Sequence, residues 1–504
     1  MDTFPDNASA SRRLFYNLVL PLLALFVCRA VYHVLVDLFW HPLATFPGPR
    51  LAVVTRLYQA YYDVYYDGKF VLHLHDLHKK YGPVVRIGPN ELHFSTPEAH
   101  KDIYHHGSKF LKNGEFYEMF NEPLTSFGTV DPIFHRKRRD TMNPLFSRRA
   151  ILKLENSIQE RASRLMRILS SKQGQVVDLH SAFRSMTLDV IYDYIYGEDA
   201  GAISYPDFQH PILANAEAVN QGAGVQRHMS IIVRINALPA FIKRRIVLSI
   251  FPELTALLES RATEFFERKA MVQQTGEREA ILSRIVEVEN ASWQSLVEET
   301  QTLTFAGSDT VANACFTGCF YVYNDLRILK KVREELKNIW SDSNTSVPFE
   351  ILEKSPYLTA VIKESLRLSH GVPVGLLRDI GPEAAQIGGY QVPGGTVVSM
   401  GATFMHWNSQ IFPEPHKFYP ERWLQDQDRE LDSYLVPFSR GPRQCIGINL
   451  AWCELYLILG YLFRKLDIEI QDMTIEDMQD IRFHFVSVLA GKKHLRGVVK
   501  GTLA

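Results

Sequence analysis

The sequence predicts a mainly helical protein with small β-sheets, built as a single domain behind an N-terminal membrane helix. Helical periodicity dominates from about residue 95 to 370, whereas strand-like stretches are few, at 84–95 and 387–402. An apolar run fills residues 14–40. With 46% hydrophobic and 12% aromatic residues the chain can bury a large core, and no repeat, low-complexity tract or long linker divides it.

The first element is the apolar run "LFYNLVLPLLALFVCRAVYHVLVDLFW". It exceeds the roughly 20 residues that span a bilayer. The alternative is a cleaved signal peptide, but the run is longer than an apolar region of about 7 to 15 residues and no small-x-small cleavage site follows it. Basic residues stand on both sides, Arg12 and Arg13 before it and Arg50 and Arg56 after it, so the positive-inside rule does not fix its orientation.

These features divide the chain into segments. The proline-rich stretch that contains "FPGPR" reads as a stiff hinge between the membrane and the globular body. We therefore expect a tail at 1–13, a membrane anchor helix at 14–40, a hinge at 41–50 and a catalytic domain at 51–504.

Two helices stand out within the domain. Residues 148–171 carry apolar side chains at helical spacing, and the longest candidate helix runs from 292 to 340. The longer one contains "AGSDTV", from Ala306 to Val311. Glycine inside a helix costs about 1 kcal/mol relative to alanine, so the stretch needs a reason. One reason is a helix crossing at which small residues permit close approach.

The cysteines and the charge exclude several classes of protein. Five cysteines in 504 residues are too few for a disulfide framework, and no C-x-x-C pair or Cys/His cluster offers zinc four ligands. A net charge of -1 argues against a nucleic-acid partner. Cys315 and Cys319 share a helical face and read as packing residues. Cys445, in "PFSRGPRQCIG" at 437–447, remains to be explained.

Two further motifs are weak when each is taken alone. Glu364 and Arg367 lie three apart on one helical face, where an exposed pair is usually worth less than about 1 kcal/mol. Arg422, in the loop "FYPERW", offers a second arginine that can share the carboxylate of Glu364.

The spacing around Cys445 is the strong signal. Phe438, Gly441, Arg443, Cys445 and Gly447 form an F-x-x-G-x-R-x-C-x-G pattern that resembles the haem-binding loop of the cytochrome P-450 superfamily. The resemblance implies haem b with Cys445 as axial ligand of the iron. We expect the glycines to allow a tight turn close to the macrocycle, Arg443 to pair with an acidic edge group, and Phe438 to shield the sulfur. An incidental buried cysteine would not explain this spacing.

The weaker motifs then fall into the order of that family, which implies the single-domain cytochrome P-450 fold. Glu364, Arg367 and Arg422 match its buried charge triad, a structural feature. "HRKRR", at 135–139, matches the helix that contacts the haem propionates. The expected propionate ligands are His135, Arg139 and Arg378, because arginine pairs with carboxylates in a bidentate fork.

"AGSDTV" matches the family's oxygen-activation site. Ala306 and Gly307 would leave room above the iron, and Asp309 and Thr310 would deliver protons; Val311 stands where many relatives carry a second hydroxyl. A haem sensor or electron carrier would not need the Asp309 and Thr310 pair. A haem-thiolate isomerase or dehydratase working without a reductase would also use the thiolate, so this alternative stays open.

The resemblance also implies a setting. The microsomal class is anchored in the endoplasmic reticulum membrane by a single span, with a cytosolic catalytic domain that receives NADPH electrons through NADPH-cytochrome P-450 reductase. The stretch 109–150 is most similar to fungal secondary-metabolite oxygenases such as the trichodiene-oxygenase-like group. This favours an apolar terpenoid substrate, with a polyketide or alkaloid skeleton as the alternative.

Two surfaces follow from the resemblance. A basic face at Arg136, Lys137 and Arg138 would steer the acidic reductase, unless it is merely a solvated helix face. Glu115 and Glu118 are expected to face solvent, which leaves the substrate pocket without a charge. The expected lining of that pocket is Phe116, Phe120, Phe305, Ala306, Val372, Val374 and Leu376.

Overall fold

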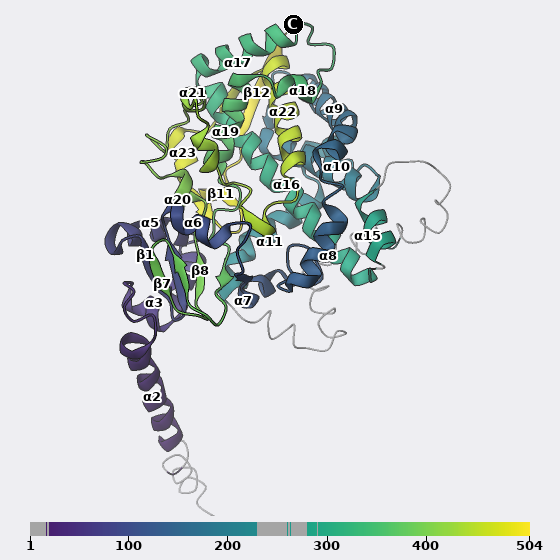
Figure 1. Cartoon of the computed structure of the whole chain (residues 1–504). Helices are drawn as coiled ribbons and strands as arrows, with labels where there is room; N and C mark the ends of the chain where they lie inside the picture. Colours follow the sequence, from purple (N-terminus) through teal and green to yellow (C-terminus); the bar gives the residue numbers. More distant parts are fainter. Residues whose placement is uncertain are drawn as a thin grey trace, which may run out of the picture.

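The computed structural model describes residues 17, 20–228, 260, 263, 280–289 and 291–503. The expected tail at 1–13, and residues 14–16, 18 and 19 of the expected anchor, lie outside the described residues. Figure 1 shows a predominantly helical body, with a sheet-containing region beside the point where an isolated N-terminal helix projects from it. A mainly helical chain with small sheets is what the periodicity predicted.

The projecting helix is α2, Leu20–Leu35, which continues as the π-helical turn η2, Val36–Trp40. Together they form a 21-residue apolar helix with mean hydropathy 1.9 and no buried side chain in its most apolar window. The predicted hinge is fastened to the body, because Arg86 N donates to Pro47 O at 2.8 Å and a Cβ on Gly48 would lie 2.1 Å from Arg86 O. The side chain of Arg86, in β1 (Val84–Gly88), also donates to Asp37 O at 2.8 Å, which joins the start of η2 to this strand.

The remaining helices carry most of the chain. Their bounds are α3 Arg50–Val54, α4 Leu57–Ala60, η3 Tyr61–Tyr65, α5 Phe70–Tyr81, α6 Pro97–Tyr104, α7 Gly114–Tyr117, η4 Glu118–Phe120, α8 Pro132–Met142, α9 Arg148–Ser171, α10 Leu179–Tyr196, η5 Ala202–Ser204, η6 Pro206–Phe208, α11 Pro211–His228, α15 Ile281–Glu289, α16 Trp293–Asn324, α17 Leu326–Ile339, α18 Phe349–Leu352, α19 Pro356–Ser369, α20 Thr403–His406, α21 Glu421–Gln425, η7 Glu430–Ser433, η8 Gly441–Arg443, α22 Ile448–Lys465, α23 Ile475–Gln479 and η9 Ala490–Lys492.

The largest sheet joins distant parts of the chain in the order β1-β2-β8-β5-β3. Antiparallel pairing links β1 to β2, β8 to β5 and β5 to β3, and β2 runs parallel to β8. Three smaller sheets pair β6 with β7, β10 with β11, and β12 with both β4 and β9. The strands are β1 Val84–Gly88, β2 Glu91–Phe94, β3 Leu111–Lys112, β4 Val176–Asp178, β5 Arg378–Asp379, β6 Ala385–Ile387, β7 Tyr390–Val392, β8 Val397–Ser399, β9 Leu466–Gln471, β10 Ile481–Phe483, β11 Ser487–Leu489 and β12 Arg496–Thr502.

Two sequence expectations need correction. The helix expected over 292–340 is two helices, α16 and α17, because Asp325 leaves the helical conformation (φ -123°, ψ 99°) and its side chain caps α17 by accepting from Arg327 N. The stretch 387–402 is only partly a hairpin. Its first half pairs β6 with β7 through Gly388 and Gly389 at positive φ, whereas β8 joins the larger sheet.

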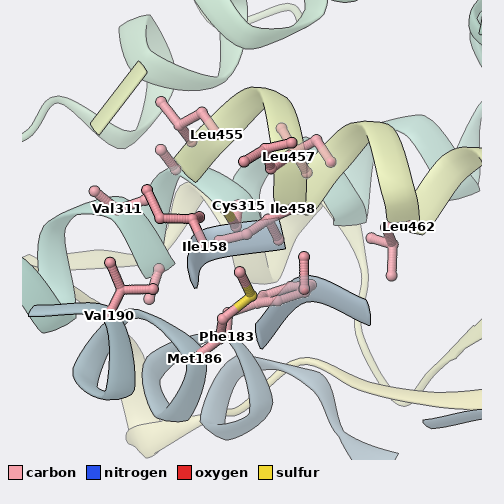
Figure 2. Close-up of a cluster of buried hydrophobic side chains, with 14 of the residues drawn as sticks. Ile158, Phe183, Met186, Val190, Val311, Cys315, Leu455, Leu457, Ile458 and Leu462 are labelled. Atoms are coloured by element: carbon pink, nitrogen blue, oxygen red, sulfur yellow. The ribbon is translucent and has the colours of Figure 1, made fainter. Parts of the chain in front are cut away.

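The main core surrounds α16. Figure 2 shows side chains of α9, α10, α16 and α22 converging there, among them Ile158, Phe183, Val311, Cys315 and Ile458. Cys315 and Cys319 are both fully buried, as expected of packing residues.

Glycines allow two close approaches to α16. A Cβ on Gly307 would lie 2.8 Å from the side chain of Ile191 on α10, and one on Gly318 would lie 2.6 Å from Ser365 Oγ on α19. The helix crossing considered for "AGSDTV" is therefore present at Gly307.

Candidate active site

A cavity of about 530 Å³ lies between the middle of α16 and the loop that carries Cys445. α16 contributes Ala306, Asp309 and Thr310, and the loop contributes Phe438 and Cys445. The two segments that the sequence singled out for chemistry thus line one cavity.

The loop is shaped by its backbone. Cys445 N donates to Phe438 O at 2.9 Å, which closes the turn around the thiol. Gly441 has φ +79°, and a Cβ there would lie 2.4 Å from Tyr104 O. The glycine at position 441 thus lets the Cys445 loop approach the end of α6, whereas we expected it to let the loop approach the macrocycle. Gly447 does line the cavity.

The thiol of Cys445 faces the cavity. Cys445 has accessible surface, yet protein atoms surround its thiol on all sides. This surface therefore belongs to the cavity that Cys445 lines. Burial raises the pKa of the Cys445 thiol, against the smaller opposing effects of the Gly447 amide and of Arg139. A bound cation such as a metal ion would favour the thiolate.

The opposite wall presents an acid and an alcohol. Thr310 Oγ1 donates to Ala306 O at 2.9 Å, one turn earlier on α16. Asp309 accepts from Arg184 Nε at 2.7 Å. Asp309 also lines a neighbouring cavity of about 550 Å³, so it stands between the two spaces.

Basic side chains gather at one edge of the cavity. His135 and Arg139, on α8, and Arg443 line it as the sequence suggested they would. Arg378 does not line it: the guanidinium is turned toward Tyr117 Oη, at 3.1 Å, and nearby backbone oxygens. Its register partner in β3, Lys112, lines the cavity instead.

These basic groups form no ion pair with a carboxylate in the described part of the chain. Across residues 20–228, 280–289 and 291–503, no ion pair involves Lys112, Arg139, Arg378 or Arg443. Burial and the neighbouring arginines lower the pKa of Lys112 far below its usual value, and they lower that of Arg443 to about 10. Burial lowers the pKa of His135 to about 3, so its ring is neutral at pH 7. An anion at this edge would relieve the repulsion.

α19 and α21 meet at a buried charge triad. Glu364 accepts from Arg367 Nη2 at 2.8 Å and from Arg422 Nε at 3.1 Å, and its other oxygen accepts from Trp423 Nε1 at 2.9 Å. All four side chains are buried. The structure therefore brings together residues that the sequence separates by almost 60 positions.

The apolar wall is largely as expected. Phe116 is the exception, because it lies beside Arg227 around a separate pocket of about 20 Å³. Glu115 forms a surface ion pair with Arg56, and Glu118 is exposed. The expected residues that do line the cavity are Phe120, Phe305, Ala306, Val372, Val374 and Leu376.

The expected basic face is smaller than the sequence suggested. Arg136 and Lys137 are exposed, but Arg138 is only 1% exposed and pairs with Glu289 at 3.0 Å and with Glu299 at 2.5 Å. The helical phase of α8 turns Arg138 inward with His135.

The donor set fits iron protoporphyrin IX. Cys445 offers one sulfur ligand for iron in an otherwise largely apolar cavity, and the unpaired cations at one edge match the two carboxylates of the porphyrin. His135, Arg139, Arg443 and Lys112 would hold those carboxylates. Arg378, the register partner of Lys112, would add its positive charge to this edge without lining the cavity.

Comparisons with known proteins agree with this geometry. The "Cytochrome P450 monooxygenase pbrB" of Penicillium brasilianum is 32% identical over 473 residues, covering 90% of each chain. The "Cytochrome P450 monooxygenase TRI4" of Trichoderma arundinaceum is 32% identical, covering 90% of this chain and 89% of the relative. The "Cytochrome P450 monooxygenase aflU" of Aspergillus parasiticus is also 32% identical, covering 93% and 95%.

A solved structure and a family model extend the comparison. The "Retinoic acid bound cyanobacterial CYP120A1" superposes with a TM-score of 0.68 over 87% of this chain and 95% of that one, at 22% identity, which supports the fold. The family model "Cytochrome P450" matches residues 47–494, which include the Cys445 loop, the charge triad and the acid and alcohol of α16. The chain belongs to the cytochrome P450 family.

Proposed function

We propose that this monooxygenase inserts one oxygen atom from O2 into a largely apolar small molecule of terpenoid type in fungal secondary metabolism. The observation that supports this most is that Cys445 and the Asp309 and Thr310 pair line one and the same cavity. Between them the wall is made mainly of apolar side chains, including Phe120, Phe305, Val372, Val374 and Leu376. A free ion in such a wall would face a large desolvation cost.

Each residue has a role. When haem is bound to Cys445, its iron supplies the site of O2 activation, and electron donation from the thiolate favours O–O cleavage. Asp309, which borders the second cavity, takes up a proton from that side. The hydroxyl of Thr310 gives up its bond to Ala306 O and passes the proton into the main cavity. The apolar wall orients the substrate and excludes water from it.

The electrons come from NADPH through a membrane-bound flavoprotein reductase. The apolar helix Leu20–Trp40 anchors the chain in the endoplasmic reticulum membrane, with the catalytic domain in the cytosol. The exposed cations Arg136 and Lys137 lie on α8, the helix that supplies His135 and Arg139 to the site. An acidic partner docked against this face would approach the haem edge.

The test uses the full-length holoenzyme with purified reductase in lipid nanodiscs. We expect NADPH and O2 to be consumed together when a sesquiterpene or diterpene is added, and mass spectrometry to detect the product with one 18O atom from 18O2. Product that forms equally fast without NADPH and O2 would instead identify an isomerase or dehydratase. A panel in which only carboxylates or amines displace water from the iron would contradict the apolar substrate.

A further inference from the structure

The cavity wall contains a buried carboxyl group that has no role in the function proposed above. Glu122 lines the cavity and is only 8% exposed. Its Oε2 is hydrogen-bonded to the hydroxyl of Thr302, which also lines the cavity from α16. Asn121, Gln226 and Gln301 line the cavity as well, so the wall has several polar groups among its apolar ones.

The backbone at Glu122 is fixed by its own turn. Thr125 Oγ1 donates to Glu122 O at 3.0 Å, and Gly128 N donates to Thr125 Oγ1 at 2.8 Å. A Cβ on Gly128 would lie 1.9 Å from Glu122 O, so only glycine allows this close approach. The turn therefore holds Glu122 in place before any ligand binds.

The same turn is fastened to α16. Leu124 N donates to Glu298 Oε2 at 3.0 Å, and Ser126 N donates to Glu299 Oε2 at 2.9 Å. Arg138, from α8, pairs with Glu299. These contacts keep Glu122 beside Thr302, on the face of α16 that borders the cavity.

The charges around Glu122 favour its neutral form. Arg138 is engaged by Glu299 and by Glu289 of α15, and no ion pair reaches Glu122 from the described part of the chain. Burial raises the pKa of Glu122 to about 8; the Thr302 bond opposes this, and Glu298 and Glu299 add to it. At pH 7 the group is a carboxylic acid, which can donate as well as accept a hydrogen bond.

From this arrangement we infer that Glu122 and Thr302 form a specificity site for one neutral oxygen atom, a ketone or hydroxyl, on an otherwise apolar substrate. The inference rests on the proposed function and narrows its substrate class to oxygenated terpenoids. Thr302 precedes Thr310 by two helical turns, about 12 Å along α16. Binding of the oxygen at Glu122 would hold the substrate at a distance from the Thr310 end of the cavity and so select the carbon that is attacked.

The test compares a terpene ketone with its parent hydrocarbon, using dissociation constants from the spin-state shift of the full-length ferric enzyme. We expect Glu122→Leu to weaken ketone binding by tenfold or more and to broaden its product distribution, with hydrocarbon binding unchanged. Glu122→Gln keeps a donor and should retain ketone binding. The control Glu115→Gln, at an exposed glutamate of the same segment, should change neither ketone binding nor hydrocarbon binding.

A pH series separates this role from a merely structural one. Ketone affinity of the parent enzyme should fall above pH 8, as Glu122 loses its proton, while that of Glu122→Gln stays level. If Glu122→Leu loses the same affinity for ketone and hydrocarbon, or loses affinity for neither, the inference is overturned. Tighter binding of a matched amine that gives the same low- to high-spin shift as the ketone would overturn it too, because an amine that does not ligate the iron would gain affinity from an ionised Glu122.

A second measurement does not depend on the terpenoid proposal. If no terpene of the panel shifts the spin state, the terpenoid proposal fails. The infrared carbonyl band of protonated Glu122 can still be followed, in the difference between the infrared spectra of the parent enzyme and of Glu122→Gln. A shift of this band on adding a small ketone such as cyclohexanone supports the site. An unchanged band at saturating ketone overturns it.

Discussion

Replacing Glu364 by alanine would leave two buried arginines, Arg367 and Arg422, without their counter-charge. Its two oxygens accept from Arg367 at 2.8 and 2.9 Å and from Arg422 at 3.1 Å. They also accept from the indole of Trp423 at 2.9 Å and from Tyr419 N at 2.9 Å. Glu364 and Arg367 have no exposed side-chain surface. Water therefore cannot replace the lost carboxylate without opening the core.

The magnitude follows from this burial. Removing one partner of a buried ion pair typically costs about 3–5 kcal/mol. Arg367 keeps its bonds to His406 O at 2.8 Å and Pro415 O at 2.5 Å, which partly solvate its charge. We therefore expect a loss near 3 kcal/mol, which is about a hundredfold change in the ratio of folded to unfolded protein. Against a typical net stability of about 5–15 kcal/mol, this loss is large.

The assay is denaturant unfolding of the detergent-solubilised holoenzyme, followed by haem absorbance, with haem content at expression as a second readout. The control is Glu414→Ala, which removes an exposed carboxylate 3.2 Å from Lys417 and should cost less than about 1 kcal/mol. A Glu364→Ala protein as stable as this control would show that the triad does not stabilise the fold.

Three further predictions concern the site and its partner. Thr310→Ala should retain haem and substrate-induced spectral shifts but divert NADPH electrons to peroxide. The control Thr304→Ala, which removes the equivalent bond from Thr304 Oγ1 to Thr300 O on the same helix, should not divert them. An unchanged yield of product per NADPH in Thr310→Ala would contradict the proton-transfer role of Thr310. Lys112→Met should speed haem transfer to a scavenging apoprotein about tenfold, because a hydrogen bond to a charged group is worth about 1.5–3 kcal/mol. The control Lys101→Met, at an exposed lysine, should leave the transfer rate unchanged. Equal transfer rates for the two variants would show that Lys112 does not hold a propionate. Lys137→Glu should slow haem reduction by the reductase, most strongly at low salt, whereas Lys330→Glu elsewhere on the surface should leave the reduction rate unchanged. A reduction rate that is lowered equally at all salt concentrations would point to damaged haem binding instead.

The parts of the site that the sequence predicted are those set by short spacings. The Cys445 pattern and "AGSDTV" each lie within about ten residues, so their geometry is largely local. The link from Glu364 and Arg367 to Arg422 is long-range. The residue types showed that Arg422 can share the carboxylate of Glu364, but only the family resemblance implied a buried triad. The split between α16 and α17 was readable in principle, because Asp325 before a helical segment is a cap signal.

Other residues were misplaced because their partners are long-range. Lys112 has no motif of its own, and it enters the site only because β3 pairs with β5. Arg378, its register partner, was expected at the cavity edge, but its guanidinium is bonded to Tyr117 Oη and to backbone oxygens instead. Arg138 was grouped with its basic neighbours, although helical phase alone would have separated it from Arg136 and Lys137.

Glu122 could not be found from the sequence. Its burial depends on a turn closed by Thr125 and Gly128 and on docking of that turn to α16. A glutamate in a loop is normally exposed, which is what we expected of Glu115 and Glu118. Only the folded loop distinguishes the third glutamate of this segment from the first two.

The absorption spectrum of the reduced carbonyl complex tests the central claim, that Cys445 is the thiolate ligand of a haem enzyme. The parent protein should show the red-shifted Soret band that a thiolate opposite carbon monoxide produces. Cys445→Ser should lose this band, while Cys453→Ser, at a fully buried cysteine eight residues along, should keep it. An unchanged band in Cys445→Ser, or its absence from the parent holoprotein, would contradict the account.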